Sequence, residues 1–432
     1  MKDLARGLDD VSRRSFLSRA ALSLLGVGSV PFLERMAQAQ DIGPVPLRPG
    51  AKAKNVIYLF MSGGMTHLDT FDLKPGAETQ GPTEATKTSA DGVLINKLFV
   101  KLAKQMHHVV AVNSMTSTQG AHAQGQYFMH TSYAPRATIK HPSIGAWLNL
   151  MAGARNPNLP GHVAIGGGNN GASAGWMESR FGPLPIGNPA AGLQNSKRPS
   201  NVSADAYAAR MKRLEEMNQA FEAKIDHKDV RAYGDMYDQA VRLMSSKDLE
   251  AFDLTKEPAE LRDAYGADAF GQGCLLARRL VEHKVRFVEV QLGGWDTHNQ
   301  NFEAMDRKLP VLDAAVGTLL EDLHRRGLLE ETLVVLATEF GRTPDIREER
   351  EGRDHYPKAF SCLLAGGGVK GGRTYGKTDA EGKEVVEKKV TIPDFNATIG
   401  YALGLPLGHV VHSPSGRPFK VADKGEPVKD LF

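Results

Sequence analysis

The sequence predicts an α/β fold with a mainly parallel central sheet and helices on both of its faces. Short apolar runs typical of buried strands alternate along the chain with longer segments of helical periodicity. Several of these runs end in glycines, and His, Asp or Glu follows within a few residues. Because open α/β sheets bind ligands at the carboxyl ends of their strands, this pattern also predicts a functional site at one edge.

Residues 1–39 are predicted to be an export signal that precedes the fold. Arg13 and Arg14 stand before Ser-Phe-Leu, a moderately apolar run follows, and residues 37–39 form an A-x-A-like cleavage site. The paired arginines match a twin-arginine signal, and an ordinary secretory signal or membrane anchor is the alternative. We expect residues 40–432 to form one exported, periplasmic domain without a transmembrane helix.

Strands are predicted where a short apolar run is bounded by turn residues. In chain order they are 55–61, 108–114, 163–165, 287–292, 332–338 and 360–364. Between them, apolar residues at helical spacing predict a helix that ends near Met129 and further helices over 141–155, 268–283, 303–328 and 393–405. The first strand follows a Pro-containing linker, and the last helix begins with Pro393 and Asp394.

Two segments depart from this alternation. Residues 203–255 are rich in helix-forming residues with apolar positions at helical spacing, which predicts a helical insertion or cap on the sheet. Crossover helices are the alternative. Residues 369–390 are polar and are predicted to form an excursion or a hairpin.

Composition limits the classes of partner. The formal net charge is +3, and no long Lys/Arg block or basic aromatic stripe is present, so nucleic acid is not an expected partner. The two cysteines, Cys274 and Cys362, could pair in an oxidising compartment, but we favour two small buried apolar side chains.

The candidate site residues follow or precede the predicted strands. They are His67, Asp69 and Asp72, then His122, Asp296, His298, Glu339, Arg342, Asp354 and His355. Imidazoles and carboxylates hold divalent cations, and a guanidinium suits phosphate or sulfate oxygens. Gathering so many titratable groups at one edge is costly unless a cation or an anion offsets their burial. Any one of them alone is more simply explained as a helix cap or a local hydrogen bond.

Several longer motifs carry a family resemblance. NVIYLFMSGGMTHLDTFD, GGWDTH, TEFGRTP and GRDHYP, together with the twin-arginine leader, resemble the family known as domain of unknown function 1501. The resemblance covers nearly the whole mature chain. That family is considered similar in fold to the alkaline phosphatase and sulfatase superfamily, which implies metal-assisted hydrolysis of a phosphate or sulfate ester.

The chain departs from the superfamily pattern at specific positions. Gly63 and Gly64 stand where the superfamily has Asp after the first strand, and His122 lies near the position of its nucleophile. Glu339 and Phe340 stand where the superfamily has Asp and His. The resemblance therefore implies one metal, held by Asp296, His298, Glu339 and His355, in place of a complete two-metal site.

The predicted function is an exported metal-dependent hydrolase of a small-molecule or glycan phosphate or sulfate ester. The metal would be Zn, Ca or Mg. His122 would act as base, nucleophile or ligand, and Arg342 would bind the anion. Further pocket candidates are His67, Asp69, Asp72 and Asp354. The alternative is a catalytically inactive relative that binds a glycan or another anionic ligand, or that scaffolds a cell-envelope partner.

Overall fold

The computed structural model describes residues 44–432 except 168–170, 194–195, 197–200, 226–233 and 235–238. The predicted export signal lies outside the described residues. Within them, no helix has both the length and the apolar character needed to cross a bilayer.

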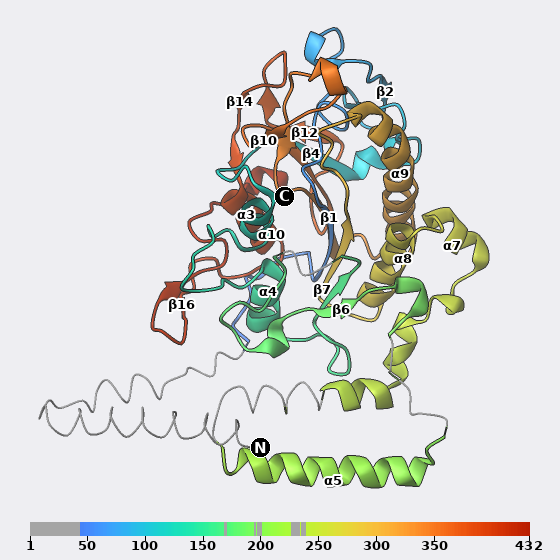
Figure 1. Ribbon diagram of the computed structural model, residues 1–432, viewed down its shortest axis with the longest axis vertical. Coiled ribbons are helices and arrows are strands. Elements are labelled where there is room, and N and C mark those ends of the chain that lie inside the picture. The colour runs from blue at the N-terminus through green and yellow to red at the C-terminus, as the bar shows by residue number, and fades with distance from the viewer. Residues whose placement is uncertain (1–43, 168–170, 194–195, 197–200, 226–233, 235–238) are drawn as a thin grey trace, which may run out of the picture. The chain divides into compact units, whose positions relative to one another are not determined.

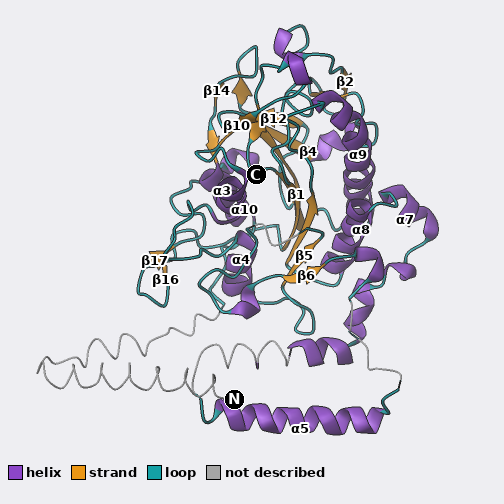
Figure 2. Ribbon diagram, in the orientation of Figure 1, coloured by secondary structure: helices purple, strands orange, loops and turns teal. Residues whose placement is uncertain are grey.

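The centre of the fold is a nine-stranded sheet (Figures 1 and 2). Along the sheet the order is β12-β4-β11-β8-β1-β7-β5-β6, and β15 also pairs with β4. The strands are β1 (Asn55–Met61), β4 (Val109–Thr116), β5 (His162–Ile165), β6 (Leu184–Ile186), β7 (Phe287–Leu292), β8 (Thr332–Ala337), β11 (Phe360–Gly366), β12 (Arg373–Tyr375) and β15 (Val390–Thr391). Only β11 runs antiparallel to its neighbours β4 and β8, so the predicted mainly parallel sheet is confirmed.

Helices cover both faces of the sheet, as predicted. Figure 1 shows α3, α4 and α10 on one side of β1 and α8 and α9 on the other. The helices are α3 (His122–Thr131), α4 (Ile144–Ala152), α5 (Ala204–Glu222), α7 (Ala259–Tyr265), α8 (Ala269–Glu282), α9 (Asn301–Arg325) and α10 (Ile392–Ala402).

Strand β1 lies in the middle of the sheet and is buried on both faces. Ile57, Leu59 and Met61 belong to the apolar core that includes α8 and α9. The alternate residues Tyr58 and Phe60 point to the other face, where both rings contact His130 of α3. This two-sided burial explains why β1 is an unbroken apolar run in the sequence.

The remaining elements are small. Two-stranded pairs join β2 (Ala85–Lys87) to β3 (Leu94–Asn96), β9 (Gly341–Arg342) to β10 (His355–Tyr356), β13 (Lys377–Thr378) to β14 (Val385–Glu387), and β16 (Val411–His412) to β17 (Pro418–Phe419). The predicted hairpin within 369–390 is thus present, and β12 and β15 beside it also extend the main sheet. Helix α5 lies within 203–255, and its role as a cap stays a prediction. Cys274 and Cys362 are buried and unpaired, as favoured.

Candidate metal centre

The candidate site is assembled by loops at one edge of the sheet. Asp296 and His298 follow β7, and Glu339 follows β8. His122 is the first residue of α3, shortly after β4, and His355 belongs to β10, just before β11. Segments far apart in the sequence therefore meet where the parallel strands end.

The glycine turn after β1 makes room for this assembly. Gly63 has φ +123°, and a Cβ atom there would lie 2.6 Å from the backbone nitrogen of Asp296. Only glycine permits both the conformation and the close approach. The Gly63 N–H donates to Glu339 Oε1 at 2.9 Å. The turn thus fixes the loops that carry Asp296 and Glu339 against each other.

Three imidazoles surround one oxygen of Asp296. The Nε2 atoms of His298, His122 and His355 lie 3.1, 3.3 and 3.3 Å from Asp296 Oδ1. His298 Nε2 and His355 Nε2 are 3.1 Å apart. Ligand atoms of His122, Asp296 and His355 all lie within 4.8 Å of one another. In a tetrahedral zinc site, ligand atoms about 2.1 Å from the ion are about 3.4 Å apart, so these spacings suit a metal.

The opposite nitrogen of each ring is bonded to an acceptor. His122 Nδ1 lies 2.8 Å from Glu339 Oε1, and His298 Nδ1 lies 2.7 Å from Asp354 Oδ1. His355 Nδ1 lies 2.9 Å from the carbonyl oxygen of Gly120. Carboxylates and carbonyls only accept, so we infer that each Nδ1 carries the proton. In the neutral rings, each Nε2 then presents a lone pair toward Asp296, the arrangement found around metal-binding histidines.

Burial and partners shift the pKa values of the central groups. Burial raises the pKa of Asp296, but the hydrogen bond and charge of Arg342 outweigh it and lower the pKa to about 2. The hydrogen bond to Glu339 raises the pKa of His122, whereas burial lowers the pKa of His355. A bound cation has to replace the proton that Glu339 favours on His122.

Arg342 is fully buried and faces inward. Its Nη2 lies 2.5 Å from Asp296 Oδ1 and also donates to the carbonyl of Gly63, and its Nε donates to the carbonyl of Gly64 at 2.9 Å. Its Nη1 donates to the carbonyl of Arg353 at 3.1 Å. This placement differs from the predicted anion-binding arginine, because the planar fork is occupied by the glycine turn and by Asp296.

Glu339, predicted to be a metal ligand, is bonded to the groups around it. It is fully buried, and its Oε1 accepts from the Gly63 N–H and from His122 Nδ1. Glu339 Oε1 therefore lies at Nδ1 of the His122 ring, whereas His122 Nε2 faces Asp296. Asp354 occupies the equivalent place behind His298 and also pairs with Arg347 and Arg350.

Three other predicted pocket residues serve the surrounding loops. Asp69 is buried and forms an ion pair with Arg353, at 2.8 Å from Nε to Oδ2. Asp72 pairs with Lys74, and His67 Nε2 lies 2.9 Å from the carbonyl of Gly382. None of the three is among the groups around Asp296 Oδ1. Asp69 is connected to the site through its partner Arg353, which directly precedes Asp354 and His355 in the chain.

Sequence reasoning missed two contributors. Gly120 supplies a backbone carbonyl, which no side-chain pattern reveals. Gln126 donates from Nε2 to Ser62 Oγ at 3.0 Å and to Glu339 Oε1 at 3.3 Å. Its signal was present, because Gln126 lies four residues after His122 on the same face of a predicted helix.

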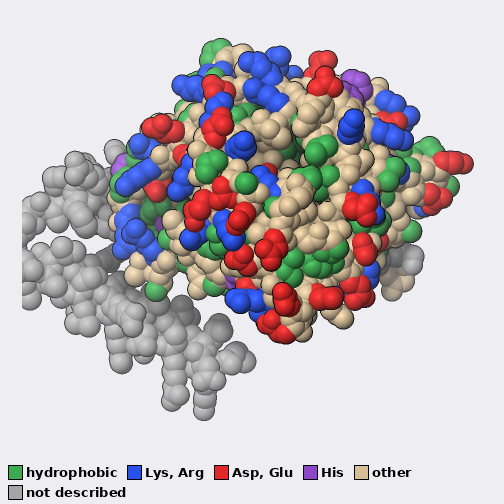
Figure 3. All heavy atoms as spheres, turned by 90° about the horizontal axis from the view of Figure 1, so that it is seen from above, with side chains coloured by type: hydrophobic (Ala, Val, Ile, Leu, Met, Phe, Trp, Pro, Cys, Tyr) green, Lys and Arg blue, Asp and Glu red, His purple; other side chains and the backbone are tan. Residues whose placement is uncertain are grey.

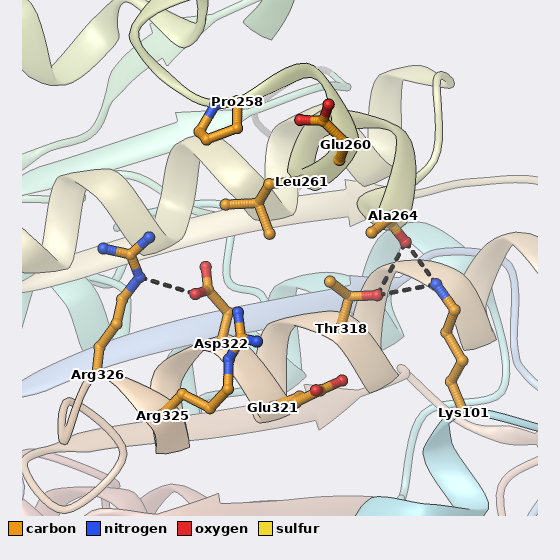
Figure 4. Close-up of a pocket in the computed structure, with 10 residues that line it drawn as sticks. All are labelled: Lys101, Pro258, Glu260, Leu261, Ala264, Thr318, Glu321, Asp322, Arg325 and Arg326. Carbon is orange, nitrogen blue, oxygen red and sulfur yellow. Dashed lines mark hydrogen bonds and ion pairs between the residues drawn. The ribbon is translucent and has the colours of Figure 1, made fainter.

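A separate pocket lies between α7 and α9 (Figure 4). Its lining includes Lys101, Thr318, Asp322 and Arg326, far from the start of α9 near His298, roughly 30 Å along the helix. Figure 4 shows Lys101 and Thr318 bonded to the carbonyl of Ala264, and Arg326 bonded to Asp322. These polar groups bind each other, so we treat this pocket as part of the packing between the two helices.

The surface seen from above Figure 1 is mixed in charge. In Figure 3, acidic and basic side chains of the described residues are interspersed over this face and do not separate into large patches of one sign.

Fold and site together define an α/β protein with a candidate metal centre at the carboxyl edge of a mainly parallel sheet. The chain belongs to the family described as Protein of unknown function (DUF1501), whose sequence profile matches residues 53–432. The resemblance predicted from the motifs is thereby confirmed. No curated protein matches the sequence.

The solved structures to which this chain is similar include a protein of the alkaline phosphatase superfamily. The lipoteichoic acid synthase LtaP from Listeria monocytogenes has a TM-score of 0.41 at 10% identity, covering 86% of this chain and 79% of that one. The PsFucS1 sulfatase from Pseudoalteromonas sp. has 0.37 at 14%, covering 87% and 73%. An alkaline phosphatase superfamily protein from Vibrio parahaemolyticus has 0.39 at 11%, covering 84% and 69%. Similarity this distant carries no inference about activity.

Proposed function

We propose that this protein is an exported, metal-dependent hydrolase of a phosphate or sulfate ester. One divalent ion would be held by His122, Asp296 and His355, whose ligand atoms all lie within 4.8 Å of one another, and His298 Nε2 lies beside them, 3.1 Å from His355 Nε2. The observation that carries the proposal is the convergence of three Nε2 atoms on Asp296 Oδ1, with each Nδ1 bonded to an acceptor. Export is supported by the predicted leader.

Zinc suits this set of donors best. Two imidazoles and one carboxylate, those of His122, His355 and Asp296, are a donor set typical of catalytic zinc, which keeps a fourth position open for water or substrate. Calcium and magnesium prefer oxygen ligands in larger number. A bound divalent ion would supply Lewis-acid polarisation of an ester oxygen. The Asp296 side chain is 47% exposed, so a substrate can reach the centre from solvent.

The remaining groups hold the ligands. Glu339, Asp354 and the carbonyl of Gly120 fix the three rings through Nδ1, as outer partners of metal-bound histidines do. Arg342 favours the ionised form of Asp296 and holds it beside the Gly63–Gly64 turn. We accordingly assign His122 to metal binding, and Glu339 and Arg342 to positioning.

The second candidate is a catalytically inactive relative that binds a glycan or another anionic ligand in the cell envelope. One observation favours it. Among the described residues, a single group of potential ligands meets the distances a metal needs, and it contains His122, Asp296 and His355. A second ion to clamp the leaving group would therefore need ligands from elsewhere.

The experiment that tests the proposal measures metal content and hydrolysis together. Elemental analysis of the purified exported protein should find about one zinc per chain, which Asp296→Ala should lose and the exposed-site control Asp91→Asn should retain. The zinc-loaded protein is then assayed with p-nitrophenyl phosphate and p-nitrophenyl sulfate. Zinc binding with hydrolysis of either ester supports the hydrolase, and zinc binding without hydrolysis supports the second candidate. A folded protein that binds no divalent metal contradicts both the metal site and the hydrolase.

A further inference from the structure

Helix α3 carries a polar stripe that continues inward from the metal centre. His122, Gln126 and His130 follow each other at intervals of four residues, so they lie on one face of the helix. His122 begins the helix beside Asp296. His130 lies two turns further on and is completely buried in the protein.

The inner end of the stripe is fixed by a buried ion pair. His130 Nε2 lies 3.0 Å from Glu289 Oε1, and His130 Nδ1 donates to the carbonyl of Gln126 at 2.7 Å. The His130 ring also packs edge-on against Phe60, with centroids 4.6 Å apart. Burial lowers the pKa of His130, but the charge and hydrogen bond of Glu289 outweigh it and raise the pKa, which favours the imidazolium.

The outer end of the stripe is fixed by Glu339. This carboxylate accepts from His122 Nδ1 at 2.8 Å and from Gln126 Nε2 at 3.3 Å. Gln126 Nε2 also donates to Ser62 Oγ at 3.0 Å. The first turns of α3 are thereby bonded to the loops that follow β1 and β8.

The two carboxylates that bond to α3 come from strands β7 and β8, which also lead into the loops of the metal centre. Glu289 belongs to β7, which leads into Asp296, and Glu339 follows β8. Each helical residue turns the helix by about 100°, so bonds at both ends fix the rotation of α3 about its own axis. That rotation decides where His122 Nε2 points. A buried ion pair gives little net stability compared with apolar packing, whereas its geometry is specific.

We propose that Glu289 and His130 are positioning residues of the metal centre, which fix the rotation of α3 so that His122 Nε2 faces Asp296 Oδ1. The inference rests on the proposed metal binding and extends it to residues two helical turns away from the ion. Neither side chain touches the ligand atoms, so both act through α3.

The test compares zinc affinity in variants of the full protein. Glu289→Gln keeps the size of the side chain and removes its charge. The matched control is Glu257→Gln, which removes a buried carboxylate that pairs with Arg278 at 2.6 Å beside α8. We expect both variants to lose stability, but only Glu289→Gln to weaken zinc binding, by about tenfold. Cobalt substituted for zinc should show a changed visible absorption spectrum in Glu289→Gln alone.

A second variant covers the case in which Glu289→Gln does not fold. The double substitution Glu289→Met with His130→Leu replaces the ion pair by apolar packing, which proteins often tolerate. It should fold and bind zinc about tenfold more weakly, with the altered cobalt spectrum. If a folded variant keeps the zinc affinity and the cobalt spectrum of the wild type, the inference about Glu289 and His130 is wrong, and the proposed function is unaffected. A wild type that binds no zinc would overturn the proposed function as well.

Discussion

His298 and His355 face each other through their Nε2 atoms, which are 3.1 Å apart. The Nδ1 atom of His298 is hydrogen-bonded to Asp354, and that of His355 to the carbonyl of Gly120. In two neutral rings held this way, two lone pairs point at each other, and they repel unless a proton or a cation lies between them. The pair is therefore the part of the site whose geometry depends most directly on metal.

Zinc should stabilise the wild type and fail to stabilise a variant that lacks one of these rings. A ligand that binds only the folded state adds about 2.7 kcal/mol to the unfolding free energy at roughly 100 times its Kd. We expect this gain for the wild type and little of it for His355→Gln in urea unfolding with and without zinc. The exposed His409→Gln is the control and should gain as much as the wild type. Equal gains for all three proteins would place zinc elsewhere.

The pH dependence of zinc binding should follow His122. Its pKa is raised from 6.5, chiefly by the hydrogen bond to Glu339. In the metal-free protein, the protonated His122 ring therefore stabilises the folded state. This contribution to the unfolding free energy is fully present below about pH 6.5 and is lost as pH rises through the pKa of His122 in the folded protein. Zinc needs the unprotonated ring, so zinc affinity should rise over that same interval.

Glu339→Gln should move this interval toward lower pH, because it removes the largest cause of the shift. Competition titrations of zinc from about pH 5.5 to about pH 8.5 would measure the change. Glu384→Gln, a substitution at an exposed residue that pairs with Lys358, is the control and should keep the wild-type profile. The same profile in Glu339→Gln as in the wild type would mean that His122 does not control zinc binding.

Removing the guanidinium of Arg342 should destabilise the fold as well as the site. Arg342→Met leaves the carbonyls of Gly63 and Gly64 without their donor and Asp296 without its cation, a loss of about 3 kcal/mol or more. Arg342→Lys restores the charge but not the planar fork, so we expect an intermediate unfolding free energy. Arg307→Met on the surface of α9 should leave the urea midpoint unchanged. A loss from Arg342→Met no larger than that of Arg307→Met would refute the positioning role.

The Gly63 turn offers a comparison between two glycines. Gly92 has φ +75° and an empty surrounding, so Gly92→Ala should cost only the backbone strain of about 1 kcal/mol. Gly63→Ala adds a clash with the backbone of Trp295 and Asp296, and its φ of +123° is also further from the left-handed region that other residues can adopt. We expect a larger loss in urea unfolding and a loss of zinc affinity that Gly92→Ala does not show. Equal effects of the two substitutions would mean that the close approach at Gly63 is unimportant.

The order of the main elements could be predicted because strands buried on both faces consist mostly of apolar residues, and this composition is visible in the sequence. Strands β1 and β8 are short apolar runs, β7 has apolar residues at four of its six positions, and α9 repeats its apolar residues at helical spacing. The pairing of β12 and β15 with β4 could not be predicted. Both are very short edge strands in a polar segment, and their place depends on contacts with residues far away in the sequence.

The sequence predicted several of the groups that the structure brings together. It did not predict which of them surround Asp296 Oδ1 and which contact the Nδ1 atoms of the histidine rings. Asp296, His298 and His355 were expected as ligands, and the structure does bring them together. Glu339 and Arg342 have the same chemistry in the sequence as a ligand and an anion-binding group would have. Their roles depend on which way each side chain points from a buried strand end, and this follows from the Gly63 turn and the rotation of α3.

The pairing of β9 with β10 places His355 directly opposite Arg342. The chain between them leaves from β8 and returns to β11, which are neighbours in the sheet. The intervening residues, 343–354, therefore form a loop that is closed at its base by a short ladder. Insertions or deletions near the tip of this loop can therefore change its length while the ladder keeps His355 in place opposite Arg342.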